Sequence, residues 1–271
     1  MADRSERIRI FEETLALCGI DESMKETVAG SVRGQRIVWA DDALAPAAPV
    51  YAEDAEIVLS EKRTVAAALD CPEEKVCILN FASSVTPGGG VSRGSSAQEE
   101  SICRVTTLYP ALTAPNAMPF YEEHRRKIRS GEMSRANSDD LIYTPGVAAV
   151  REDDFDCALL PVERRKLLDV ITCAAPDLRD YFFRITEKEL SAILRRRIGR
   201  ILDAAADAGA EVLILGAFGC GVFGNPPELV AEAFSLELAP RIRCFRRVEF
   251  AVYCSSYDDD NYTAFRKYFG R

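Results

Sequence analysis

The sequence predicts an α/β fold. Short, apolar, β-favouring runs alternate with segments of helical pattern along most of the chain. Two glycine-rich loops each follow a buried run and precede a helix. The chain has 271 residues, of which 48% are hydrophobic and 28% charged, so it can bury a full core. In α/β sheets, ligands bind at the carboxyl ends of the strands, and this is where both loops are expected to lie.

The first 46 residues predict an N-terminal helical extension. Ile8, Phe11 and Leu15 recur at helical spacing. Residues 41–49 begin with two acids and end in a Pro/Ala-rich stretch, which is typical of a connection. We expect one catalytic domain to follow, at residues 47–271.

The remaining elements follow from apolar periodicity and from turn residues. Asn225 as a cap and Glu228 three residues later favour a helix start at that point. The polar residues 129–140 predict a loop. Strands are expected at residues 56–59, 75–81, 168–176 (running into a Pro-terminated turn), 212–215 and 248–253. Helices are expected at residues 64–69, 97–108, 187–208, from 225 onwards, and 261–269.

Charge and cysteine content limit the possible partners and cofactors. The net charge is −9 and the densest basic cluster has only three arginines (195–197), so we expect no general nucleic-acid binding. No apolar run approaches the roughly 18 residues of a membrane span, so no membrane partner is expected. Nine cysteines without a Cys-x-x-Cys pair predict reduced thiols and a cytoplasmic protein, or a nuclear one if the source is eukaryotic.

The single histidine, His124, lies in the charged stretch 121–127 and is expected to be a solvated helix residue. A histidine-dependent catalytic triad would have to use it, and a His-rich metal site is excluded. We expect no metal site.

The first glycine loop (residues 88–90) is followed by Gln98, Glu99 and Glu100. The second glycine loop comprises residues 216–224. Backbone N–H groups in such loops and at helix N-termini bind anions, which favours a diphosphate held between the two loops. Alternatively, the three glycines after Pro87 only permit a tight turn.

The glutamate pair (Glu99 and Glu100) has competing explanations. Ser96 and Glu99 match a capping box, so Glu99 could be purely structural. Glu100 lies about 100° further around the helix and is expected to face elsewhere, as a catalytic acid or as a solvated first-turn acid. A helix N-terminus lowers a carboxyl pKa, so burial or a phosphate would have to raise the pKa of a general acid.

A second interpretation of the second glycine loop is a dinucleotide site. Gly219, Gly221 and Gly224 match the Gly-x-Gly-x-x-Gly pattern between a strand and a helix. The match is weak because the next strand carries its acid, Glu249, inside the strand and not at its end. An NAD-dependent oxidoreductase is therefore the remoter alternative.

Together, residues 79–83, 87–90 and 98–100 resemble the signature of poly(ADP-ribose) glycohydrolases. The likeness is closer to the microbial branch, since residues 216–226 look like its second phosphate loop, and it spans roughly residues 50–270. The resemblance implies a macrodomain-like, three-layer α/β/α fold with a mixed central sheet. ADP-ribose would bind in a cleft at the strand ends.

By position, the resemblance implies that Glu100 is the catalytic acid and that Glu99 binds ribose hydroxyls beside the scissile bond. Asn80 would position the distal ribose, the two glycine loops would contact the diphosphate, and Phe223 would pack near the ribose. The ADP-ribose-binding residues implied in this way are Asn80, Gly88, Gly89, Gly90, Gln98, Gly219, Cys220, Gly221, Val222, Phe223 and Asn225.

The implied function is hydrolysis of the ribose–ribose O-glycosidic bond of poly(ADP-ribose), with ADP-ribose as the product and without a metal or redox cofactor. The partners would be the polymer or ADP-ribosylated macromolecules. Two alternatives share the same motifs: a mono-ADP-ribosyl hydrolase acting on protein or nucleic acid, and a non-catalytic ADP-ribose-binding module.

Overall fold

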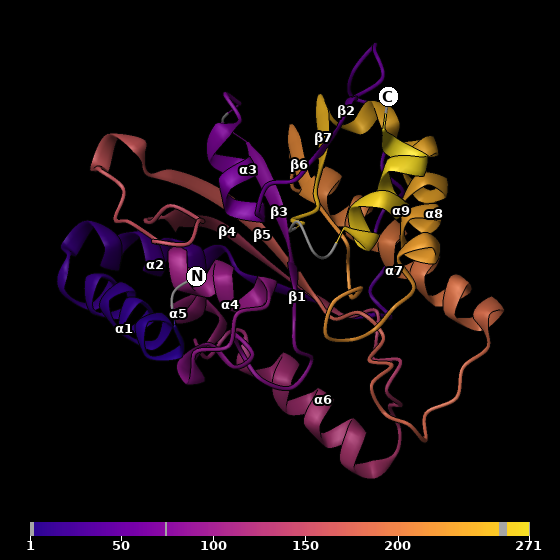
Figure 1. Cartoon of the computed structure of the whole chain (residues 1–271), viewed down its shortest axis with the longest axis horizontal. Coiled ribbons are helices and arrows are strands. Elements are labelled where there is room, and N and C mark those ends of the chain that lie inside the picture. The colour runs from indigo at the N-terminus through magenta and orange to yellow at the C-terminus, as the bar shows by residue number, and fades with distance from the viewer. Residues whose placement is uncertain (1–2, 74, 255–258, 271) are drawn as a thin grey trace.

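In the computed structural model, which describes residues 3–73, 75–254 and 259–270, a seven-stranded sheet is covered by helices (Figure 1). The strand order is β1-β4-β5-β3-β6-β7-β2. β4 runs antiparallel to both of its neighbours, whereas the other adjacent pairs are parallel. The strands are β1 (Arg36–Val38), β2 (Glu56–Ser60), β3 (Val76–Phe81), β4 (Leu141–Ala149), β5 (Lys166–Cys173), β6 (Val212–Leu215) and β7 (Arg247–Ala251).

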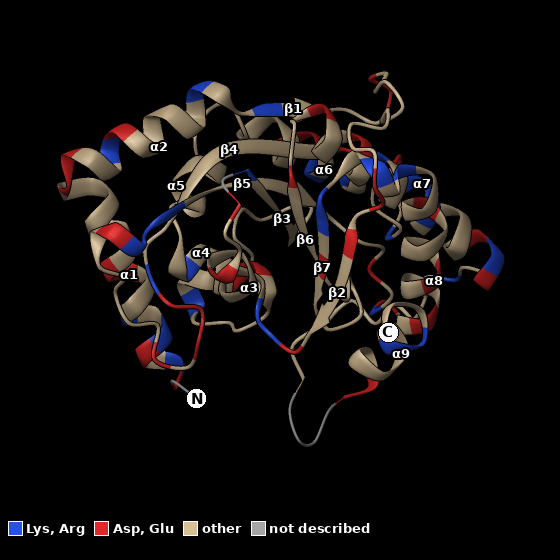
Figure 2. Ribbon diagram, turned by 90° about the horizontal axis from the view of Figure 1, so that it is seen from above, with Lys and Arg blue, Asp and Glu red and all other residues tan. Residues whose placement is uncertain are grey.

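Helices cover both faces of this mixed sheet, which confirms the expected three-layer α/β/α architecture. Figure 2 shows α7, α8 and α9 on one side of the sheet and α1, α3 and α4 on the other. The helices are α1 (Arg4–Ile20), α2 (Glu22–Gly34), α3 (Thr64–Asp70), α4 (Gln98–Val105), α5 (Leu108–Leu112), α6 (Met118–Ser130), α7 (Glu187–Asp207), α8 (Pro227–Leu238) and α9 (Asp260–Phe269).

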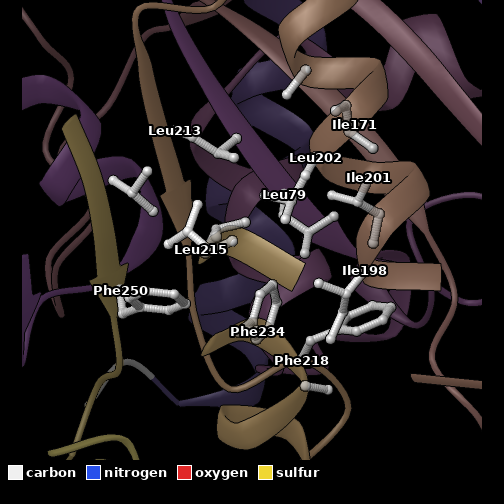
Figure 3. Close-up of a cluster of buried hydrophobic side chains, with 14 of the residues drawn as sticks. Leu79, Ile171, Ile198, Ile201, Leu202, Leu213, Leu215, Phe218, Phe234 and Phe250 are labelled. Carbon is white, nitrogen blue, oxygen red and sulfur yellow. The ribbon is translucent and has the colours of Figure 1, made fainter. Parts of the chain in front are cut away.

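Alternate side chains of β3 belong to two hydrophobic clusters, one on each face of the sheet. Cys77 and Leu79 point into the cluster beneath α7 and α8, part of which is drawn in Figure 3, while Val76 and Ile78 point into the cluster beneath α3 and α4. Because both faces of β3 are covered, its sequence is apolar without interruption until Asn80. The first polar side chain of the strand therefore lies at its carboxyl end.

Most sequence-predicted elements are present, but some predictions were wrong or missed an element. The helix expected over residues 97–108 ends at Val105, and α5 begins separately at Leu108. β1, β4, α2 and α6 were not predicted. β4 contains Pro145 and Gly146, which argue against a strand; the structure accommodates them with a register shift between Thr144 and Val147 and a positive φ of 64° at Gly146.

The N-terminal segment is helical, as expected, but it is joined closely to the rest of the chain. The buried stripe of α1 includes Thr14, whose Oγ1 donates to the carbonyl oxygen of Arg104 (2.8 Å). Arg4 Nε donates to the carbonyl oxygen of Arg93 (2.8 Å). β1 lies within the first 46 residues and pairs with β4. The domain boundary after residue 46 stays a prediction, and the segment before it also contributes an edge strand.

None of the helices in the described part of the chain is both long enough and apolar enough to cross a membrane.

Candidate active site

A cavity of about 920 Å³ lies at the carboxyl ends of the central strands. Its walls come from the ends of β3 and β7, the start of α4, the second glycine loop and the segment after β4. The glutamate pair lines it, together with Gly89 and Gly90 of the first glycine loop. The sequence-predicted motifs therefore meet in one cavity.

The glutamate pair is held by Gln98, the first residue of α4. Gln98 Oε1 accepts from the N–H of Phe81 (2.8 Å), and its Nε2 donates to the carbonyl oxygen of Leu79 (2.7 Å). These two bonds fasten the N-terminus of α4 to the end of β3. The expected capping box is wrong, because the cap residue is Ala97 and no side chain caps this helix. The binding role of Gln98 stays a prediction, since both of its amide atoms already have protein partners.

The carboxyl group of each glutamate is bound through one oxygen only. Glu99 Oε2 accepts from the N–H of Ser83 (2.7 Å), and Glu100 Oε1 accepts from the N–H of Gly90 (2.8 Å). Glu99 Oε1 and Glu100 Oε2 are buried and have no hydrogen-bond partner among the described residues. The expectation of a solvated Glu100 is wrong, since only 8% of the residue is exposed. One oxygen of each carboxyl group is therefore left without a partner in the described part of the chain.

Helix geometry predicts that the two carboxyl groups face apart. In the structure they converge instead. Both approach Gly89, where an added Cβ would lie 2.4 Å from Glu100 Oε1 and 3.1 Å from Glu99 Oε2. Gly89 has a φ of 57°, a conformation that glycine adopts without strain. The tight turn therefore makes room for the glutamate pair.

Burial raises the pKa of the Glu99 carboxyl to about 8, and the nearby Glu100 carboxyl adds to the rise. The N–H of Ser83 and the amide of Asn80 oppose this shift without cancelling it. Burial therefore outweighs the effect of the helix N-terminus on Glu99. At neutral pH the protonated Glu99 can donate a hydrogen bond to a ligand oxygen.

The raised pKa of Glu99 predicts a pH-dependent stability. The unfolded chain releases this proton near pH 4.5 and the folded chain near pH 8, so in this window the folded state binds more protons and stability falls as pH rises. Glu99→Gln removes this loss. We expect the free energy of unfolding of the variant, relative to wild type, to increase from pH 5 to pH 8 in urea titrations.

Glu232→Gln is the control, because Glu232 is an exposed residue of α8. The free energy of unfolding of the Glu232→Gln variant, relative to wild type, should stay constant across this pH range. Parallel pH profiles for wild type and Glu99→Gln would contradict the raised pKa of Glu99.

Asn80 lies behind the glutamate pair at the end of β3 and is fully buried. Its Nδ2 donates to Thr172 Oγ1 (3.2 Å), while Oδ1 has no hydrogen-bond partner in the described part of the structure. Because Asn80 does not line the cavity, the structure places it in the second layer of the site. Its role in positioning ribose stays a prediction.

The two glycine loops differ in the N–H groups that they leave available. In the first loop, the N–H of Gly89 donates to the carbonyl oxygen of Thr86 (3.0 Å), and that of Gly90 is used by Glu100. In the second loop, no acceptor within the described ranges forms a hydrogen bond with the N–H groups of Gly221, Val222 or Phe223. The second loop is therefore the better donor for a diphosphate, and the contact expected from residues 88–90 stays a prediction.

The buried side chain of Asn225, which is 1% exposed, holds the second glycine loop in place. Asn225 Nδ2 donates to the carbonyl oxygens of Pro176 (2.7 Å) and Gly219 (3.0 Å). Its predicted role as a helix cap is wrong, because the cap position of α8 is Pro226. Asn225 thus holds the loop, and a direct contact with ADP-ribose stays a prediction.

The remaining predicted residues lie at the edge of the site. A Cβ on Gly88 would lie 2.6 Å from the ring of Tyr109, so Gly88 packs against α5. Cys220 Sγ lies 3.8 Å from the carbonyl oxygen of Phe218. Neither Gly88 nor Cys220 lines the cavity.

Sequence reasoning missed several cavity residues. Arg179 lies over the Phe223 ring, 4.9 Å from its centroid. Arg63 lies 5.0 Å from the ring centroids of both Phe155 and Tyr253. All five residues line the cavity. Phe223 was predicted, whereas Arg63, Phe155, Arg179 and Tyr253 were not, because none of these four lies in a motif.

The prediction for His124 was wrong, since the side chain is buried. Its Nδ1 donates to the carbonyl oxygen of Ser84 (3.1 Å), and Nε2 lies 2.7 Å from Asp140 Oδ2. Burial alone would raise the pKa of Asp140, but hydrogen bonds from His124 and Ser138 lower it to about 2. Ser84 follows Ser83, which binds Glu99, so α6 supports the loop that holds the glutamate pair.

A mixed sheet between two helical layers, with two buried carboxyl groups at the start of α4 and glycine-rich loops at the strand ends, fits a hydrolase with a macrodomain-like fold. The family described as "Microbial-type PARG, catalytic domain" matches residues 8–152. The chain belongs to this microbial-type poly(ADP-ribose) glycohydrolase family. This assignment confirms the predicted enzyme class and does not fit the dinucleotide-oxidoreductase alternative.

Solved structures agree with the family. The chain is 32% identical to poly(ADP-ribose) glycohydrolase from Thermomonospora curvata, with a TM-score of 0.85 over 98% of this chain and 100% of that one. The same enzyme bound to the inhibitor ADP-HPD gives 34% identity and a TM-score of 0.82, over 97% and 99% of the two chains. The enzyme from Deinococcus radiodurans in complex with ADP-ribose gives 33% and 0.78, over 89% and 96%. Comparison with curated protein sequences gave no match.

Proposed function

We propose that this protein hydrolyses the ribose–ribose O-glycosidic bond of poly(ADP-ribose) and releases ADP-ribose, with Glu100 as general acid and base. One observation carries the proposal: the glutamate pair lines a cavity of about 920 Å³ between the glycine loops, and each carboxyl group keeps one oxygen without a hydrogen-bond partner among the described residues. The membership of the chain in the family supports the reaction, and the relatives bound to ADP-ribose or ADP-HPD support the ligand.

The reaction proceeds in two proton transfers. The acid oxygen of Glu100 is Oε2, since Oε1 accepts from the N–H of Gly90. As the bond between C1″ and the 2′-oxygen of the leaving ribose breaks, Glu100 transfers a proton to the 2′-oxygen and an oxocarbenium-like sugar forms. A water molecule then bonds to C1″ and returns a proton to Glu100. Protonated Glu99 donates a hydrogen bond to a ribose hydroxyl and holds the sugar in place.

The diphosphate lies against the second glycine loop. The available N–H groups of Gly221, Val222 and Phe223 provide the hydrogen bonds. Arg179 stands over Phe223 but is paired with Asp177 (2.6 Å), so it stabilises the loop more than it neutralises the ligand. The charge of the diphosphate also offsets the positive charge that develops on the sugar.

A panel of three substrates tests the function: poly(ADP-ribose), mono-ADP-ribosylated protein and ADP-ribosylated DNA. We expect ADP-ribose to be released fastest from the polymer. Release from the mono-ADP-ribosylated substrates alone would identify a mono-ADP-ribosyl hydrolase. Binding of all three without turnover would identify a binding module.

We also propose a cytoplasmic location. Of the nine cysteines, seven are buried, which fits a chain that keeps its thiols reduced. Cell fractionation tests this location, and recovery of the protein outside the cytoplasm would contradict it.

A further inference from the structure

The loop between β5 and α7 carries two exposed aromatic side chains that the proposed reaction does not use. Tyr181 is 78% exposed and Phe182 is 88% exposed, the highest fractions among the large hydrophobic residues that the structure describes. Their ring centroids are 5.8 Å apart and the rings stand edge to face. Neighbouring exposed aromatic side chains cost solubility and commonly mark a binding surface.

This aromatic pair (Tyr181 and Phe182) follows closely in the chain on a residue of the cavity wall, Arg179. The preceding residues are attached to the second glycine loop: the N–H of Leu178 donates to the carbonyl oxygen of Phe223 (2.9 Å), and Arg179 lies over the Phe223 ring. Arg179 lines the cavity. Phe182 is three residues further along, so its Cα lies within about 11 Å of the Cα of Arg179.

Positive charge accompanies the aromatic pair. The guanidinium of Arg184 lies 4.9 Å from the Tyr181 ring centroid and donates to the carbonyl oxygens of Tyr181 and Phe183. Within the described residues it has no carboxylate partner. The nearby Asp180 accepts from the N–H of Phe182 (2.9 Å) and faces Arg135 (3.5 Å). In a chain of net charge −9, the aromatic pair therefore has an arginine beside it that no described carboxylate neutralises.

We propose that the aromatic pair is a second nucleotide subsite. It stacks the adenine of the second ADP-ribose unit, the one across the cleaved bond from the unit held in the cavity, and Arg184 contacts a phosphate of that second unit. Aromatic side chains with adjacent arginines bind nucleotide bases in many single-stranded nucleic-acid proteins. The inference rests on the proposed function, because a polymer whose ribose lies beside Phe223 continues past this loop.

The test is a binding experiment in the Glu100→Gln background, where turnover is suppressed. Calorimetry gives Kd for ADP-ribose and for a dimer of two linked ADP-ribose units. We expect the dimer to bind about tenfold more tightly than ADP-ribose, in line with stacking of one base. Adding Tyr181→Ala and Phe182→Ala should abolish this gain and leave Kd for ADP-ribose unchanged.

Two further variants make the result specific. Phe182→Tyr keeps a stacking face and should retain the gain, whereas Tyr268→Ala removes an exposed aromatic of α9 and should have no effect. An equal gain with and without the aromatic pair would overturn the inference, as would an equal loss for both ligands. Failure of the proposed function would show instead as absent ADP-ribose release by the wild-type enzyme, independently of these affinities.

Discussion

Glu100→Gln should slow the release of ADP-ribose from the polymer by about 10²- to 10⁴-fold, the usual contribution of a general acid. The glutamine oxygen can still accept the hydrogen bond from the N–H of Gly90, so the fold and the affinity for ADP-ribose should be retained. What the variant lacks is a transferable proton. Steady-state turnover with the polymer, combined with calorimetric Kd for ADP-ribose, measures the two effects separately.

Two comparison variants define the result. Glu232→Gln, on the exposed surface of α8, should behave as wild type. Glu99→Gln should reduce turnover less than Glu100→Gln if Glu99 only positions the sugar. Undiminished turnover in Glu100→Gln would refute its assignment, and a larger loss in Glu99→Gln would move the proton transfer to Glu99.

Gly89→Ala should reduce turnover by about 100-fold, because displacing a catalytic group by about 1 Å has an effect of this size. The new Cβ would lie 2.4 Å from Glu100 Oε1, so the carboxyl group or the loop must shift. The φ of 57° adds backbone strain for any residue with a side chain. We expect kcat to fall, measured as ADP-ribose release under saturating polymer.

Gly131→Ala is the matched control for this substitution. Gly131 also has a positive φ (77°), but a Cβ there would have no neighbour within 4 Å. Both variants therefore carry similar backbone strain, and only Gly89→Ala disturbs the glutamate pair. Equal turnover of the two variants would show that crowding at Gly89 does not matter.

The sequence predicted those parts of the site that are encoded within a short stretch of chain. The first glycine loop, Gln98 and the glutamate pair all lie within residues 88–100, directly after a strand whose apolar pattern is unambiguous. Their joint position at the end of β3 follows from this order. The second glycine loop was found in the same way, since it follows β6 directly.

What the sequence did not predict depends on contacts between distant segments. The pattern around His124 is charged, so only the packing of α6 against the loop after β3 reveals that this side chain is buried. Asn225 looked like a helix cap because asparagine is a favoured cap residue, but in the fold its Nδ2 donates to the carbonyl oxygens of Pro176 and Gly219 instead. Glu99 matched a capping box by spacing, but the N–H of Ser83, sixteen residues away, binds its carboxyl group instead.

The buried histidine also offers a spectroscopic reporter. The chain contains one histidine, so an NMR spectrum of protein labelled with ¹⁵N-histidine would show a single imidazole. That imidazole is hydrogen-bonded to the carbonyl oxygen of Ser84, the residue after Ser83, whose N–H group binds Glu99. Its chemical shifts would therefore follow the loop beneath the glutamate pair during ligand titration, without an added probe.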